Sequence, residues 1–238
     1  MNRMIKADLR RIMKKVSFYV WYGVNFIFIF IFSGVSEYSD QTMQLQYMTC
    51  GAILPLLVSI PVFLAVYGDE MKCGAMQCII GRGISRRKVV LAKYLDCLLL
   101  ETFYFVMIEI VMYVRNILFD IGYTPTQNIT LAIFLFIIFI RIAGYLAFAS
   151  FFVYLSWSTA PGVVALLTFA VIAKLALQGA QALAHIPIYN YTFDGLLDAG
   201  FAAVSAGTPA FQIVGALAFI AAALVLTVLV FRKKEIEF

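Results

Sequence analysis

The sequence predicts an all-α membrane protein with six transmembrane helices, and three observations lead to this prediction. Of the 238 residues, 63% are hydrophobic and only 13% are charged, whereas about 25% are charged in soluble domains. The apolar residues form several runs of about 20 residues, which is the length that crosses a hydrocarbon core about 30 Å thick. Runs such as 131–140 have no polar face, which disfavours a soluble helical core.

The first 15 residues are basic and amphipathic. Ile5, Leu9 and Ile12 recur at helical spacing while the lysines and arginines occupy the other faces, which predicts an interfacial helix over 1–15 in the headgroup region. A signal peptide is disfavoured, because no small-residue cleavage site follows the next apolar run.

Six apolar spans follow, and the whole chain (1–238) is expected to form one transmembrane domain. Pro55 and Pro61 predict a kink or break in the second span, and Pro161 suits the first turn of the fifth. The segment 185–208 is too polar to span the membrane and too apolar for an ordinary solvated loop. The predicted spans are 16–34, 47–66, 89–114, 131–155, 161–183 and 209–231.

The basic residues predict the topology. Of the 18 lysines and arginines, 14 lie in the N-terminal arm, between spans two and three, or in the C-terminal tail. The positive-inside rule therefore predicts a multi-pass protein of the cell membrane with both termini in the cytoplasm. The net charge of +5 is accounted for by these anchors, which attract anionic lipid, and does not indicate a nucleic-acid partner.

The stretch 67–94 is the longest polar interruption in the first half of the chain. Within it, Met71, Ala75 and Ile79 share one apolar face at a spacing of four, which predicts a short helix over 69–80 lying across the membrane plane. The simplest interpretation of the stretch is a cytoplasmic positive anchor.

The same stretch resembles the loop between spans two and three of ABC-2-type transporter permeases. The resemblance rests on Glu70 followed by Gly74 in a Glu-x-x-x-Gly element, on the segment 83–86 (GISR), and on Lys93. The amphipathic N-terminal helix, the six spans and the basic C-terminal ending agree with that family. Many members carry Thr in place of Ala75 and Pro at the first position of 83–86.

The resemblance implies that 69–80 is a coupling helix that docks into a separate ATPase subunit. Two permease subunits, identical or homologous, would pair, and two ATPase subunits would bind beneath them. The chain has no G-x-x-x-x-G-K-[ST] loop, so ATP and Mg would act through the partner and this chain would bind no cofactor. The family also places two short helices that re-enter the outer leaflet between spans five and six. The docking residues expected here are Asp69, Glu70, Lys72, Gly74, Ile79 and Arg86.

Six charged residues fall inside the predicted spans, where a charge needs a partner or a wet cavity. The four candidates for an intramembrane role are Glu101, Glu109, Arg141 and Lys174. Glu101 and Arg141 both lie near mid-depth and are predicted to pair, with Lys174 as a competitor for Glu101. Glu109 lies nearer the outer surface, facing either Arg115 or water. Such charges fix helix register, or they line a polar substrate path or proton relay.

Other candidate sites are fewer. Tyr189 and Tyr191 beside Asp194 form a possible contact for an amphipathic substrate on the outer side. The four cysteines are interpreted as free thiols, because no second Cys or His pair completes a metal site. No catalytic constellation is evident, so the chain is expected not to be an enzyme.

The function expected from these observations is that of a permease subunit in an ATP-driven exporter. The apolar, aromatic lining of the spans favours a hydrophobic or amphipathic cargo, such as an antimicrobial peptide or a drug. The alternative is an ion-coupled secondary transporter that uses Glu101, Arg141 and Lys174. An intramembrane enzyme ranks last, because His185 is the only histidine.

Overall fold

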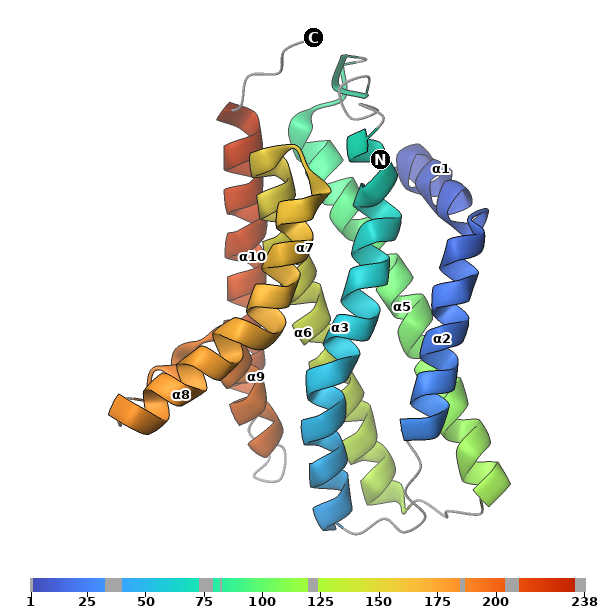
Figure 1. Ribbon diagram of the computed structural model, residues 1–238, viewed down its shortest axis with the longest axis vertical. Coiled ribbons are helices and arrows are strands. Elements are labelled where there is room, and N and C mark those ends of the chain that lie inside the picture. Colours follow the sequence, from blue (N-terminus) through green and yellow to red (C-terminus); the bar gives the residue numbers. More distant parts are fainter. Residues whose placement is uncertain are drawn as a thin grey trace.

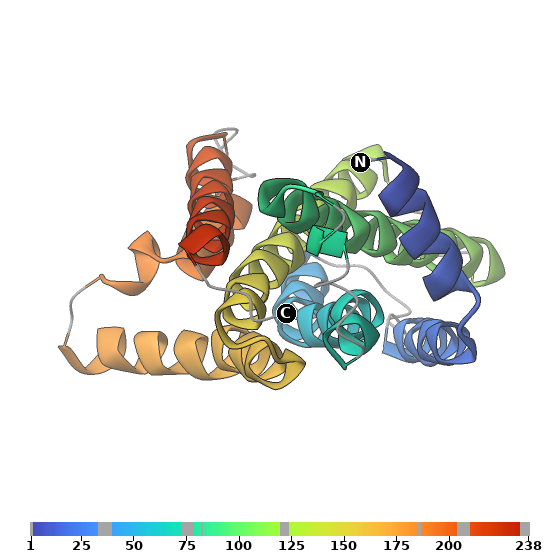
Figure 2. The same cartoon turned by 90° about the horizontal axis from the view of Figure 1, so that it is seen from above.

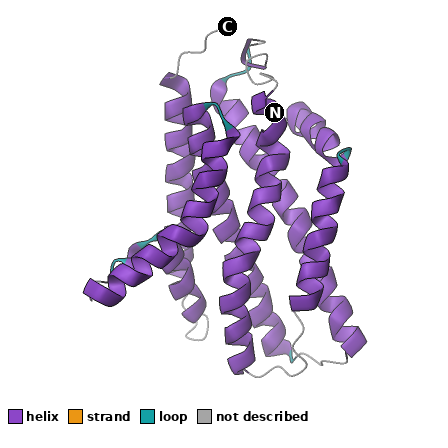
Figure 3. Ribbon diagram, viewed as in Figure 1, coloured by secondary structure: helices purple, strands orange, loops and turns teal. Residues whose placement is uncertain are grey.

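The protein is a bundle of long helices, shown in Figure 1 from the side and in Figure 2 from above. This computed structural model describes residues 2–32, 40–72, 79–81, 83–119, 124–184, 187–203 and 210–233. Within these ranges the regular elements are all helical, and Figure 3 shows only short loops between them. The helical class predicted from the sequence is therefore confirmed.

Five helical segments are long and apolar enough to cross a membrane among the residues described. They are α3 (Asp40–Lys72), α5 (Arg86–Phe119), α6 (Pro125–Ser156), a composite of α7 (Thr159–Leu167), η1 (Thr168–Ala173) and α8 (Lys174–Ala184), and α10 (Ala210–Lys233). The first predicted span is α2 (Val16–Phe32), whose 17 residues cover about 26 Å at 1.5 Å per residue. That length is shorter than a hydrocarbon core of about 30 Å.

Helix α6 lies at the centre of the bundle. It packs against α3, α5, α7, α9 (Phe193–Ala202) and α10. Thr124 caps its start in a capping box with Gln127, and Pro125 occupies its first turn, where the missing N–H costs no hydrogen bond. It ends at Trp157, whose left-handed backbone (φ 58°) lets its N–H bond the carbonyl of Val153 at 2.8 Å. The chain then reverses into α7, which packs against α6.

Of the predicted kink or break at Pro55 and Pro61, the structure excludes a break, because α3 is one continuous helix through both prolines. The predicted start of a separate helix at residue 69 is wrong, since residues 69–72 form the last turn of α3. Residues 73–78 of the predicted coupling helix, which include Gly74, lie outside the described residues, and 79–81 are helical.

One end of the bundle gathers the basic segments. Helix α1 (Asn2–Met13), the start of α5 and the end of α10 all lie at the top of Figure 1. We call this the basic end.

At the other half, α8 leaves the bundle at an angle, and α9 lies between α8 and α10 (Figure 1). Between α8 and α10 the described residues form a short 3-10 turn, η2 (Tyr189–Tyr191), and the single α-helix α9. The resemblance implied two helices there.

Candidate functional site

The basic end contains a buried ion cluster that joins three helices. Lys93 of α5 is completely buried, and its ammonium donates to Glu70 of α3 and, at 2.6 Å, to Asp8 of α1. Arg11 of α1 approaches the same Glu70 oxygen at 2.7 Å. We call Asp8, Arg11, Glu70 and Lys93 the basic-end cluster. Because each helix contributes charges to the same contacts, α1, α3 and α5 are fixed to one another next to segment 73–85.

The amphipathic pattern of α1 explains why this cluster forms. Ile12 is completely buried and packs into the core, which places the polar positions Asp8 and Arg11, at spacings of four and one, beside the ends of α3 and α5. Lys15 extends the link by donating to Asp69. Helix α1, predicted to lie in the headgroup region, is therefore joined by ion pairs to α3 and α5.

Four of the six residues expected to dock a partner have described side chains, and three of these, Asp69, Glu70 and Arg86, form ion pairs or hydrogen bonds within the chain. Glu70 belongs to the basic-end cluster. Arg86 donates to the carbonyls of Phe231 (2.7 Å) and Arg232 (3.0 Å) at the end of α10, where helix carbonyls lack partners within the helix. Asp69 is about half exposed and Ile79 is partly buried against the core. The side chains of Lys72 and Gly74 lie outside the described residues.

A second cluster of charges lies beneath the α8–α9 turn. The Arg141 guanidinium of α6 forms ion pairs with Asp194 at 3.2 Å and with Asp198. Lys174, the first residue after the π-helical segment η1, reaches the other oxygen of Asp198 at 3.2 Å. We call Arg141, Lys174, Asp194 and Asp198 the hairpin cluster. Its two cations and two carboxylates balance, so the group can lie at depth without excess charge.

Two tyrosines complete the hydrogen bonds of the hairpin cluster. Tyr145 donates to Asp194 at 2.6 Å, and Tyr189 donates to Asp198 at 2.5 Å. Burial raises the pKa of Asp194. Burial also acts to raise the pKa of Asp198, but Arg141, Lys174 and the Tyr189 hydroxyl together hold it below its ordinary value. Asp198 is therefore the carboxylate on which both cations converge.

Close backbone contacts hold α9 in this position. Thr192 caps the helix by accepting from the N–H of Gly195 at 3.2 Å. A Cβ at Gly195 would lie 1.8 Å from the carbonyl oxygen of Tyr189, and one at Gly144 of α6 would lie 2.1 Å from the ring of Phe193. At Gly195 the contact is with backbone, so this position requires glycine, whereas a side chain at Gly144 would force the Phe193 ring to shift.

The predicted pairing of Glu101 with Arg141 is wrong. Arg141 pairs with Asp194 and Asp198, and Lys174 also pairs with Asp198 rather than with Glu101. Glu101 is completely buried on α5, and within the described ranges neither of its oxygens has a hydrogen-bond partner. The prediction used depth alone, whereas the actual partners come from a helix that folds back beside α6.

The predicted substrate contact of Tyr189, Tyr191 and Asp194 is divided between the interior and the surface. Tyr189 and Asp194 are each only 8% exposed and belong to the hydrogen bonds of the hairpin cluster, whereas Tyr191 is 75% exposed. Sequence reasoning missed Asp198, which lies four residues after Asp194 on the same helical face. That spacing was the available signal.

The structure does not pair Glu109 with Arg115. Arg115 lies over the ring of Phe30 on α2, with 5.7 Å from its guanidinium carbon to the ring centre. Glu109 faces an open pocket between α5 and α6. Among the described residues, no group of His, Cys, Asp and Glu is arranged to hold a metal ion.

A comparison with protein-family models gives no match for this chain, and a comparison with curated proteins gives no relative. The function of this chain is therefore inferred from its residues and their geometry.

Proposed function

We propose that this chain is the membrane permease subunit of an ATP-driven exporter of the ABC-2 type. The observation that carries the proposal is the basic-end cluster. Lys93 and Glu70 belong to the sequence pattern that resembles the family, and they are ion-paired to each other across α3 and α5. These two helices flank the segment 73–85 that the proposal assigns to the ATPase contact.

The cluster gives that contact a physical route into the membrane. A displacement of segment 73–85 moves the end of α3 and the start of α5, and the shared charges of Asp8 and Arg11 oblige α1 to follow. A buried pair resists separation, because parting the charges leaves each of them desolvated and unpaired. The three helices therefore move together as one lever, which is what coupling to ATP hydrolysis in another chain requires.

The remaining parts of the proposal follow the same assignment. Counting α2 as a span gives six, with α1 and the end of α10 on the cytoplasmic side of the cell membrane. Two copies of the permease pair with two ATPase subunits, which supply ATP and Mg. The apolar spans favour a hydrophobic or amphipathic cargo, such as an antimicrobial peptide or a drug.

The test is a pull-down of the tagged chain from its native membrane. Because Glu70 is buried, its substitution would disturb the fold, and the docking variants are therefore Gly74→Trp and Lys72→Glu, at two of the expected docking positions. The charge-matched control is Lys6→Glu, which is exposed on α1. We expect wild type and control to recover a chain with a phosphate-binding loop, and the docking variants to lose it. Failure of the wild type to recover any ATP-binding chain after cross-linking would refute the proposal.

One observation supports a second candidate, an ion-coupled transporter. Glu101 is buried without a hydrogen-bond partner in the described part of the chain, and a carboxyl group of this kind is suited to carrying a proton. Arg141 and Lys174, which that hypothesis also used, are ion-paired with Asp194 and Asp198. Proton-driven cargo movement in vesicles that lack any ATPase, abolished by Glu101→Gln, would favour this candidate over the exporter.

A further inference from the structure

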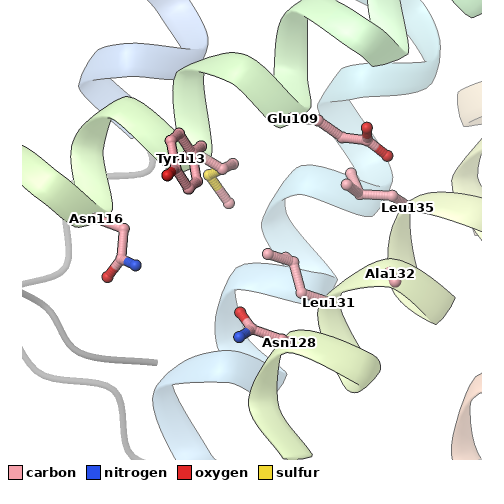
Figure 4. Close-up of a pocket in the computed structure, with 8 residues that line it drawn as sticks. Glu109, Tyr113, Asn116, Asn128, Leu131, Ala132 and Leu135 are labelled. Carbon is pink, nitrogen blue, oxygen red and sulfur yellow. The ribbon is translucent and has the colours of Figure 1, made fainter. Parts of the chain in front are cut away.

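A small pocket lies between the outer halves of α5 and α6, outside both ion clusters. Its volume is about 220 Å³, below the roughly 300–1,000 Å³ of pockets that take drug-sized ligands. Figure 4 shows side chains from the two helices facing one another across it. They include Glu109, Tyr113 and Asn116 of α5 and Asn128, Leu131 and Leu135 of α6.

The depth of the pocket can be counted along each helix from the basic end. Glu109 is 23 residues after Arg86, and Leu135 is 21 residues before Ser156. At 1.5 Å per residue these separations are about 35 and 32 Å. Both slightly exceed a hydrocarbon thickness of about 30 Å. The pocket therefore lies at the outer boundary between hydrocarbon and headgroups, with Asn116 and Asn128 further out.

The carboxylate of Glu109 has no cation of its own. It is exposed, and in the described part of the chain it makes no ion pair or hydrogen bond. The nearby Arg115 points to the opposite side of α5, against Phe30. An unpaired carboxylate that faces a pocket can form a charge-assisted hydrogen bond with a positively charged ligand.

The walls of the pocket are apolar below the amides. Figure 4 shows Glu109 extending from α5 toward Leu135 of α6, with Leu131 and Ala132 further along α6. A ligand that fits must bring a cation to Glu109 and an alkyl surface to the leucines. The limited volume favours a slender group such as a single alkyl chain.

We infer that this pocket binds a single-chain amphiphile with a positively charged ammonium head. The ammonium contacts the carboxylate of Glu109 and the alkyl chain lies along Leu135 and Leu131, while the amides of Asn116 and Asn128 lie at the other, outer end of the pocket. This inference does not depend on the proposed function, because it holds whether the ligand is cargo, regulator or competitor.

The test uses dodecylamine as the probe, with the full chain in phosphatidylcholine nanodiscs and equilibrium dialysis against empty nanodiscs. We expect saturable binding of one probe per chain, unaffected by dodecyl sulfate or dodecanol. Glu109→Gln should weaken binding at least tenfold, because a charge-assisted hydrogen bond is lost. Ala132→Trp should abolish binding by filling the pocket, while the control Ala222→Trp, at an exposed position of α10, should leave it unchanged.

Several results would overturn the inference. Wild-type affinity in Glu109→Gln, with unchanged thermal unfolding, would remove the carboxylate from the site. Equal competition by dodecyl sulfate would show that charge is not recognised. If phosphatidylethanolamine nanodiscs displace the probe, a two-chain amine-bearing lipid occupies the site and the single-chain assignment fails.

Discussion

The ammonium of Lys93 offers the sharpest test of the basic-end cluster. It is completely buried and donates to Glu70 and Asp8. Lys93→Met conserves length but leaves the Glu70 carboxylate without its closest cation. Removing one partner of a buried pair typically costs about 3–5 kcal/mol. Arg11 remains 2.7 Å from Glu70, and this retained ion pair offsets part of the cost, which leaves a net loss of about 2 kcal/mol.

The same reasoning predicts a rescue. In Lys93→Met combined with Glu70→Met, both members of the ion pair between α3 and α5 are removed, and replacing a buried pair by apolar residues is often neutral or stabilising. Asp8 and Arg11, already 3.9 Å apart, can pair with each other. The double variant should therefore be more stable than Lys93→Met alone.

The assay is thermal unfolding in a mild detergent, followed by the fluorescence of Trp21 and Trp157. For a chain of this size, 1 kcal/mol corresponds to about 2–4 °C in Tm, so Lys93→Met should lower Tm by about 4–8 °C. Leu99→Met on the exposed side of α5 controls for the introduced methionine. If the Tm losses of Lys93→Met and of Glu70→Met simply add in the double variant, Lys93 and Glu70 are not energetically coupled. That result would refute the proposal that α3 and α5 move together.

Three further predictions concern the rest of the bundle. Gly195→Ala should release α9, because its Cβ would lie 1.8 Å from a backbone carbonyl oxygen; faster proteolysis between α8 and α10 would show this, and unchanged digestion would contradict it. Arg86→Ala should loosen the end of α10 by removing hydrogen bonds of 2.7 and 3.0 Å, measured as faster amide exchange there, with no effect expected elsewhere. Neutralising Arg141 together with Asp198 should show a coupling energy of about 1–3 kcal/mol in Tm-based cycles, whereas Arg141 together with Glu101 should be additive within about 0.5 kcal/mol. The reverse pattern would restore the pairing predicted from depth.

Signals that act within one helix could be read directly from the sequence. The apolar runs matched helices α3, α5, α6, α10 and the α7–α8 composite, because span length depends only on consecutive residues. Pro161 lies in the first turn of α7 as expected. The two prolines of α3 show the limit of that reading, since neighbouring helices in a bundle can keep a proline-containing helix continuous.

For the candidate sites, the sequence identified several of the charged residues but not their partners, because the partners depend on neighbouring helices. Glu70 was predicted as a docking residue and Lys93 was noted only as part of the family-like pattern, so the sequence did not predict that the two form a buried pair. Whether a charge faces a partner or the solvent depends on which helices pack beside it, and sequence spacing along one helix does not contain that information. Only the structure shows that Arg115 faces α2, and therefore that it does not pair with the carboxylate of Glu109.

By itself, the sequence determined that this protein is helical, that its long apolar segments suit a membrane, and that its basic residues gather at one end. These are properties of composition and local order, so they need no knowledge of neighbours. Only the tertiary structure decided that Arg141 meets Asp194 and Asp198. Helix α9 folds back beside α6 and brings two carboxylates to a depth that linear counting assigned to Glu101. The partners of a buried charge are set by lateral packing, and lateral packing is a property of the whole fold.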